Sequence, residues 1–178
     1  MISLKEITMQ NFNECMSLER KSQKYVGNAT DVLAEAYIYR FNSTAYGIYL
    51  DDEIIGLVIL KDKPSNSPYS FTDLFISDHY QNKGYAKTAV SLIIDKFKSE
   101  KLASYIEIQV HNTNQYAIKS YKDNGFRITG NSQWDNSFLI MQLHIEWTGT
   151  ILTLSVKNSL THTWKNSHTF LSLCDYVK

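Results

Sequence analysis

The chain has little cysteine, little proline and no net charge. Its 178 residues include 2 cysteines and 2 prolines, and 18 Lys and Arg residues balance 18 Asp and Glu residues. Two cysteines without a CxxC pair argue against a disulfide scaffold, and the 5 histidines show no metal-ligand spacing, so we expect no metal site. A balanced charge argues against a dedicated nucleic-acid-binding protein, which normally has a basic excess.

Long apolar segments and targeting patterns are also lacking. No apolar run approaches the roughly 20 residues that a membrane-spanning helix needs. The first six residues lack the basic-then-apolar pattern of a signal peptide. We therefore expect a cytoplasmic protein with no membrane partner. Hydrophobic residues still make up 43% of the chain, which is enough for the core of one domain.

The charge that is present is distributed unevenly. Residues 1–82 contain 7 basic and 11 acidic residues, whereas residues 83–146 contain 8 basic and 6 acidic residues. An acidic first half and a basic second half suit the binding of a cation and an anion, respectively.

Hydrophobic periodicity predicts both strands and helices along the chain. The expected strands cover residues 2–8, 45–50, 53–60, 69–76, 103–110, 126–129 and 138–145, and the expected helices cover residues 12–20, 31–40, 84–98 and 114–124. Asp31 is expected to cap the second helix, and Gly125 to end the fourth. Because strands alternate with helices only in the second half, we predict an α/β fold with a mixed sheet.

One strand-to-helix junction has the strongest chemical signal. Residues 74–86 join an apolar strand to an amphipathic helix through a turn that contains Gly84. The amide groups and positive dipole end of a helix start suit an anion such as pyrophosphate. Gly84 lets the backbone approach the phosphates, and Lys83 and Lys87 add positive charge. The segment is neither a P-loop nor a dinucleotide-binding GxGxxG motif.

Two sequence blocks resemble those of the GNAT N-acetyltransferase superfamily. Gln81-Asn-Lys-Gly-Tyr-Ala86 is similar to its acetyl-CoA signature Q/R-x-x-G-x-G/A, with Ala86 where Gly is frequent. Asn114-Gln-Tyr-Ala117-Ile-Lys-Ser-Tyr121-Lys-Asp-Asn-Gly125-Phe126 resembles its second block, N-x-x-A-x-x-x-Y-x-x-x-G-F. The resemblance covers residues 2–145. It implies a GNAT-like fold, with a central mixed and splayed β-sheet flanked by helices, and an enzyme that transfers acetyl from acetyl-CoA to an amine.

The resemblance also implies roles for individual residues. Backbone groups of the splayed strand would pair with the pantetheine arm, the next loop would hold the pyrophosphate, and Asn114 would bond the pantetheine or the backbone nearby. The expected acetyl-CoA contacts are Leu74, Phe75, Ile76, Gln81, Asn82, Lys83, Gly84, Tyr85, Ala86, Lys87 and Asn114. Tyr121 would protonate the departing thiolate as the general acid.

The acceptor amine also requires a proton acceptor. An alkyl amine has a pKa of about 10.4, so it must lose a proton before it attacks the thioester. Candidate bases, which are also candidate acceptor contacts, are Glu35, Asp73 and Glu107. Each could act directly or through a water molecule, and the sequence does not choose among them.

The first half is similar to bacterial diamine and polyamine N-acetyltransferases. The similarity lies in Val26-Gly-Asn28-Ala, Leu33-Ala-Glu35-Ala-Tyr37-Ile and residues 46–56, although Asp73 stands where that group frequently has Arg. It implies an acceptor such as spermidine or spermine, and the acidic first half suits a polycation. Two alternatives stay open: another amine, such as an aminoglycoside, an amino acid or a protein N-terminus, and a CoA-binding module without catalysis. A homodimer is an expectation by analogy with the superfamily alone.

We expect two parts, an acetyltransferase domain over residues 1–146 and an extension over residues 147–178. The extension holds 10 Ser or Thr residues and 4 charged residues, and it is too short to bury a stable core alone. We expect it to add an edge strand or hairpin, or to remain mobile.

Overall fold

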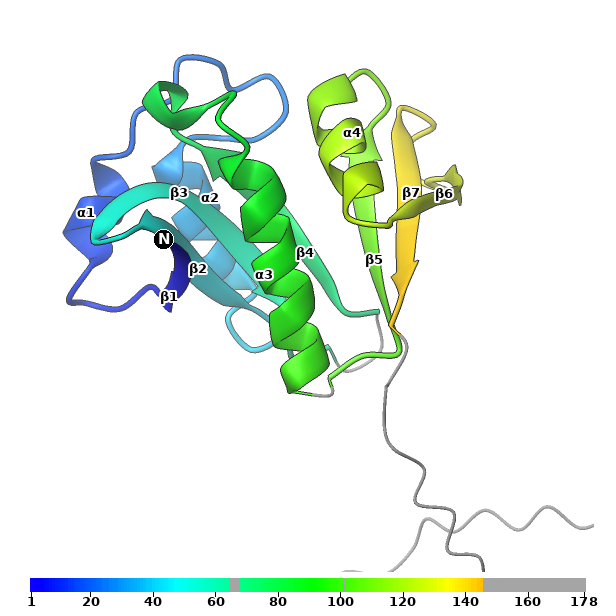
Figure 1. Cartoon of the computed structure of the whole chain (residues 1–178), viewed down its shortest axis with the longest axis horizontal. Coiled ribbons are helices and arrows are strands. Elements are labelled where there is room, and N and C mark those ends of the chain that lie inside the picture. The colour runs from blue at the N-terminus through cyan, green and yellow to red at the C-terminus, as the bar shows by residue number, and fades with distance from the viewer. Residues whose placement is uncertain (65–67, 101, 146–178) are drawn as a thin grey trace, which may run out of the picture. The chain divides into compact units, whose positions relative to one another are not determined.

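The computed structural model describes residues 1–64, 68–100 and 102–145 (Figure 1). The elements are β1 (Ile2–Glu6), α1 (Phe12–Met16), α2 (Ala29–Ile38), β2 (Thr44–Leu50), β3 (Glu53–Lys61), β4 (Ser70–Ile76), the 3-10 helix η1 (Asp78–Tyr80), α3 (Tyr85–Ser99), β5 (Tyr105–His111), α4 (Gln115–Asp123), β6 (Arg127–Asn131) and β7 (Phe138–His144). Strands and α-helices follow the predicted order. The strand or hairpin predicted for residues 147–178 lies outside the described residues.

The strands form two antiparallel sheets with one junction between them. The first sheet has the order β1-β2-β3-β4, and the second has the order β5-β7-β6. A parallel bridge pairs Tyr69 with Ile106, and the Glu107 N–H donates to the Tyr69 carbonyl at 3.0 Å. Beyond this bridge β4 and β5 diverge (Figure 1), and the described residues show no further pairing between them. The predicted α/β fold with a splayed sheet is therefore confirmed, but its mixed character comes from this parallel bridge, since each of the two sheets is itself antiparallel.

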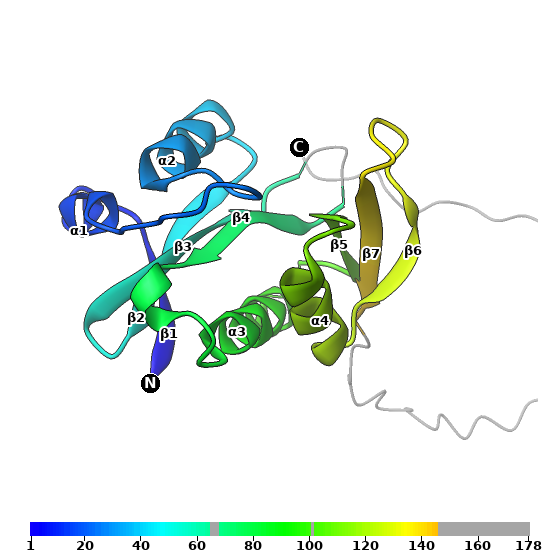
Figure 2. The same ribbon diagram turned by 90° about the horizontal axis from the view of Figure 1, so that it is seen from above.

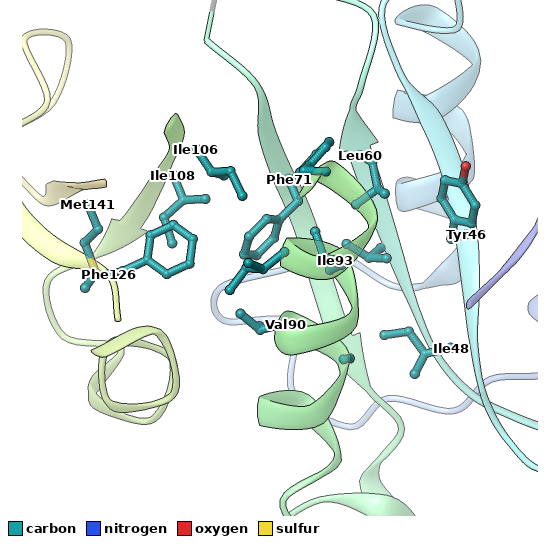
Figure 3. Close-up of a cluster of buried hydrophobic side chains, with 14 of the residues drawn as sticks. Tyr46, Ile48, Leu60, Phe71, Val90, Ile93, Ile106, Ile108, Phe126 and Met141 are labelled. Atoms are coloured by element: carbon teal, nitrogen blue, oxygen red, sulfur yellow. The ribbon is translucent and has the colours of Figure 1, made fainter. Parts of the chain in front are cut away.

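Helices cover both faces of the first sheet. Figure 2 shows α1 and α2 on one side, and α3 and α4 on the other. Two apolar clusters fill these layers. The cluster on the α3 side includes Phe71, Val90, Ile93, Phe97, Ile106, Ile108, Phe126 and Met141 (Figure 3), and the cluster on the α1 and α2 side includes Cys15, Val32, Leu57 and Phe75. Among the described residues, no helix has both the length and the apolar character needed to span a membrane.

Helix α2 begins two residues earlier than predicted, because Asn28 and not Asp31 caps its start. The N-cap is Asn28, whose side chain accepts from the Asp31 N–H at 3.0 Å. In return, the Asp31 carboxylate accepts from the Asn28 N–H at 3.0 Å. This reciprocal capping box satisfies two amides that a helix start leaves without partners. The prediction that Asp31 is the N-cap is therefore wrong, and Asp31 is instead the third residue of the helix.

Helix α1 is shorter than the predicted 12–20. It ends at Met16, and the Ser17 hydroxyl donates to the Glu14 carbonyl at 2.7 Å. Such local side-chain bonds compete with continuation of a helix. Residues 17–28 consequently form a connection that we call the α1–α2 loop.

Candidate active site

Strand β4 contains a one-residue bulge in its diverging half. Ile59 of β3 pairs with Thr72 and Leu57 pairs with Phe75, so two steps along β3 match three along β4. Asp73 lies in the bulge, between the paired residues Thr72 and Phe75, and has a φ of 52°. That left-handed conformation costs a non-glycine residue about 1–2 kcal/mol. A bulge of this kind re-aims a side chain relative to the regular strand.

Asp73 in the bulge lies near enough to Glu35 of α2 for its charge to act on that carboxyl group. Partial burial raises the pKa of Glu35, and the charge of Asp73 and a hydrogen-bonding interaction with it act in the same direction, while Lys61 opposes them. The Thr72 hydroxyl donates to Asp73 Oδ2 at 2.9 Å. Two neighbouring carboxyl groups can accept hydrogen bonds from an ammonium group, and a carboxylate with a raised pKa is the better proton acceptor.

Glu107, the third candidate base, is held elsewhere. It lies on β5 opposite Gln142 of β7, whose Nε2 donates to the Glu107 carboxylate at 2.7 Å. Glu107 is not among the groups that act on the pKa of Glu35, and the hydrogen bond that its carboxylate accepts comes from Gln142. The structure therefore groups two of the three predicted carboxylates and leaves Glu107 as a cross-strand partner.

Arg20 of the α1–α2 loop adds a positive charge close enough to Asp78 and Asp73 for both to act on it. Its guanidinium carbon lies 5.1 Å from the centre of the Phe75 ring. Its Nε donates to the Ser22 carbonyl at 2.6 Å, and within the described part of the chain its buried Nη1 has no hydrogen-bond partner. Burial lowers the pKa of Arg20, while Asp78 and Asp73 act in the opposite direction. Sequence reasoning did not include this residue among the site candidates.

Tyr121 approaches from α4, on the other face of the sheet. Its ring packs edge-on against Phe71, with ring centres 5.7 Å apart, and lies 6.0 Å from Phe126. Burial, assisted by the charge of Asp73, raises the pKa of Tyr121 to about 12. No group among the described residues hydrogen-bonds its hydroxyl. The phenol is therefore protonated at neutral pH and available as a donor.

The start of α3 is an uncapped helix end. Gly84 is the N-cap with a φ of 83°, no side chain caps the helix, and the first turn contains no acidic residue. A Cβ atom at Gly84 would meet nothing within 4 Å, so the backbone there is open to approach. The first turn presents Tyr85, Ala86 and Lys87. Unpartnered amides beside a lysine suit the pyrophosphate of acetyl-CoA, so this segment fits that substrate.

The other predicted acetyl-CoA contacts fall into two groups. In the segment Leu74–Ile76, Phe75 and Ile76 pair with β3 on one edge, and the other edge of the segment faces the diverging β5. Gln81 and Asn114, by contrast, use their side chains on the protein itself. Gln81 Nε2 donates to the Ile76 carbonyl at 2.9 Å, and Asn114 Oδ1 accepts from the Ala117 N–H at 3.3 Å. Asn114 thus bonds the backbone nearby, one of the two partners expected for it.

Loop residues Asn82 and Lys83 complete the turn before α3. Asn82 has a φ of 60°, and Lys83 Nζ lies 5.3 Å from the centre of the Tyr80 ring. Cys15 is fully buried, and burial raises the pKa of its thiol to about 11, which disfavours a nucleophilic role. Within the described ranges, no three His, Cys, Asp or Glu side chains gather as metal ligands.

A splayed sheet beside an uncapped helix start is the arrangement of acyltransferases that take their acyl group from CoA. The model of the Acetyltransferase (GNAT) family matches residues 8–126, and the chain belongs to this family. Members of the family use acetyl-CoA, and the chain is an acetyltransferase of this family. No curated protein matches the chain.

Three solved structures illustrate the shared fold. The ribosomal-protein-S18-alanine N-acetyltransferase of Escherichia coli has a TM-score of 0.63 at 14% identity, over 85% of this chain and 99% of that one. The PaiA N-acetyltransferase of Thermoplasma acidophilum, in complex with coenzyme A, has a TM-score of 0.61 at 17% identity, over 82% and 99%. The spermidine N-acetyltransferase of Vibrio cholerae, in complex with CoA and spermine, has a TM-score of 0.60 at 17% identity, over 80% and 95%. Their named acceptors differ, so these likenesses show the fold alone.

Proposed function

We propose that the chain transfers the acetyl group of acetyl-CoA to a primary amine by direct attack within a ternary complex. The observation that carries this proposal is the open, uncapped start of α3 beside the diverging strands β4 and β5, with the Tyr121 ring packed against Phe71 of β4. Acetyl-CoA supplies the activated acetyl group as a thioester. The amides of residues 82–87 hold its pyrophosphate, and the β5-facing edge of Leu74–Ile76 pairs with its pantetheine arm.

The two faces of the sheet then have complementary roles in proton transfer. On the α2 side, Glu35 and Asp73 accept the proton of the amine, directly or through water. On the α4 side, Tyr121 donates its hydroxyl proton, or a hydrogen bond, to the sulfur as it leaves. The raised pKa of Glu35 supports this division of roles, because a more basic carboxylate takes an amine proton more readily.

For the acceptor, our first candidate is a diamine or polyamine such as spermidine or spermine. The carboxyl pair and the acidic first half of the chain support a cationic acceptor. Tyr39 at the end of α2 is 53% exposed, and its ring is available for cation–π contact with a second ammonium group. The Tyr37 ring is already stacked by Arg40, whose guanidinium carbon lies 4.4 Å from its centre.

Arg20 favours a second candidate, an amine that also carries a carboxylate or carbonyl oxygen. A protonated polyamine has only hydrogen-bond donors, so it offers nothing to a neighbouring guanidinium and is repelled by it. An amino acid or a protein N-terminus carries both an amine for Glu35 and Asp73 and an oxygen for Arg20. The likeness to an enzyme named for an alanine acceptor is compatible with this class.

Thiol release from acetyl-CoA distinguishes the two candidates. The acceptor panel contains spermidine, spermine, putrescine, aminoglycosides, free amino acids and a peptide with N-terminal alanine. A polyamine with the highest kcat/KM, decreasing with added salt, supports the first candidate. A preference for an amino acid or peptide that is lost in Arg20→Gln supports the second and removes the first. CoA binding without turnover on any amine would contradict the proposed reaction.

A further inference from the structure

Asp78 bonds two loops that take different substrates in the proposed reaction. Its Oδ2 accepts from the backbone N–H of Lys21 at 2.7 Å, and its Oδ1 accepts from Gln81 Nε2 at 3.0 Å. Lys21 lies in the α1–α2 loop beside Arg20, on the acceptor side. Gln81 opens the segment of residues 81–87, which we call the phosphate loop. One carboxylate on η1 therefore connects the acceptor side to the acetyl-CoA side.

The α1–α2 loop is attached at the ends of both diverging strands. Next to Asp78, the Ser77 hydroxyl donates to the Glu19 carbonyl at 3.1 Å. At the end of β5, the Tyr25 hydroxyl donates to the Thr113 carbonyl at 3.1 Å. Figure 1 shows this loop beside η1 at the top of the molecule. Between these attachments most of its residues are exposed, and such segments open at a low free-energy cost.

We propose that Asp78 is a positioning residue that couples acetyl-CoA binding at the phosphate loop to ordering of the α1–α2 loop. This inference rests on the proposed function. The Gln81 N–H already donates to the Asp78 carbonyl, so the anion is held by the amides of residues 82–87. An anion held there restricts the adjoining Gln81, Gln81 restricts Asp78, and Asp78 restricts Lys21 and the adjacent Arg20. A ligand that orders one segment reduces the ordering cost of the next, which produces positive cooperativity between the two sites.

Hydrogen–deuterium exchange of the full chain tests the coupling with coenzyme A as the probe. In the wild type, saturating coenzyme A should slow exchange both in residues 81–87 and in residues 17–28, the latter by about fivefold or more, the lower end of typical couplings between sites. In Asp78→Ala, the slowing should persist in residues 81–87 and disappear in residues 17–28. Asp95→Ala removes the same group from an exposed position of α3, and it should behave as the wild type.

The proposal is tested by the change in exchange rate that coenzyme A causes in residues 17–28. General destabilisation by a substitution would raise the exchange rate both with and without coenzyme A. Protection of residues 81–87 alone in the wild type would overturn the coupling. Equal protection of both segments in Asp78→Ala would overturn it as well. Absence of any protection would instead refute the acetyl-CoA site itself. If Asp78→Ala does not fold, Asp78→Asn replaces it: its side-chain oxygen can serve only one of the two donors, so the protection of residues 17–28 should be reduced.

Discussion

Replacing Tyr121 by Phe removes one hydroxyl and leaves the ring in its contacts with Phe71 and Phe126. The described structure shows no hydrogen bond to that hydroxyl, so the substitution breaks none. We expect the free energy of unfolding to change by less than about 0.5 kcal/mol, as for substitutions away from structural features.

The expected loss of rate follows from the raised pKa of the phenol. Tyr121 has a pKa of about 12, whereas an ordinary thiol has a pKa of about 8.5. Complete proton transfer to the thiolate is therefore uphill by roughly 3.5 units, or about 5 kcal/mol at 1.36 kcal/mol per unit. The phenol is thus better suited to donate a hydrogen bond as charge develops on sulfur. We expect kcat of Tyr121→Phe to fall about 10²-fold, the lower end of general-acid effects.

The assay is thiol release with both substrates saturating, accompanied by calorimetric CoA binding and a thermal melt. Tyr116→Phe is the matched control, because Tyr116 lies on the same helix with 86% of its surface exposed, and its kcat should not change. The wild-type rate should show no alkaline loss from this phenol up to about pH 10. An unchanged kcat in Tyr121→Phe would refute its role as a donor, and a large fall in melting temperature would show a structural role instead.

Three further outcomes are expected. Gly84→Ala should weaken CoA binding and Gly84→Glu should abolish it, whereas Gly130→Ala, which also meets open space, should bind normally; near wild-type affinity in a folded Gly84→Glu would contradict the phosphate site. The folded-state pKa of Glu35 is raised, so stability is lost as pH rises through that pKa. Glu35→Gln should therefore raise the free energy of unfolding at pH 7 by at most about 1 kcal/mol, seen as a higher melting temperature than that of the wild type. This difference should shrink near pH 4, and a difference independent of pH would refute the assigned direction of the pKa shift. Deleting residues 147–178 should leave acetyl-CoA chemistry largely intact, and a folded but inactive truncation would show that the extension helps to build the site.

The fold was predictable because its signals are local. The buried face of α3 contains Ala89, Val90, Ile93, Ile94 and Phe97. These residues recur every three or four positions, which is the hydrophobic periodicity that predicted this helix. Gly125 follows α4 with a φ of 91°, as expected for a residue that ends a helix. Where the prediction was wrong, two local signals competed: Asn28 and Asp31 are both good caps, and the structure uses them reciprocally.

The composition of the site was less predictable because it depends on contacts between distant segments. Glu35 and Asp73 were separate candidates, and the electrostatic interaction between them links α2 to the bulged part of β4, which no local signal predicts. Arg20 was not a site candidate, because the spacing of apolar residues predicted a helix over residues 12–20 that includes it, whereas α1 ends at Met16. Ser17, a residue that often interrupts helices by bonding the preceding turn, was the available signal.

The divergence of β4 and β5 creates two unpaired strand borders inside one domain. Strand borders of this kind are templates for pairing with foreign chains, and proteins protect them with bulges, charges or covering loops. This chain uses a bulge with an aspartate at its centre on β4, and a loop attached by Tyr25 to the end of β5. The opening that we propose for the pantetheine arm is therefore also a hazard for self-association.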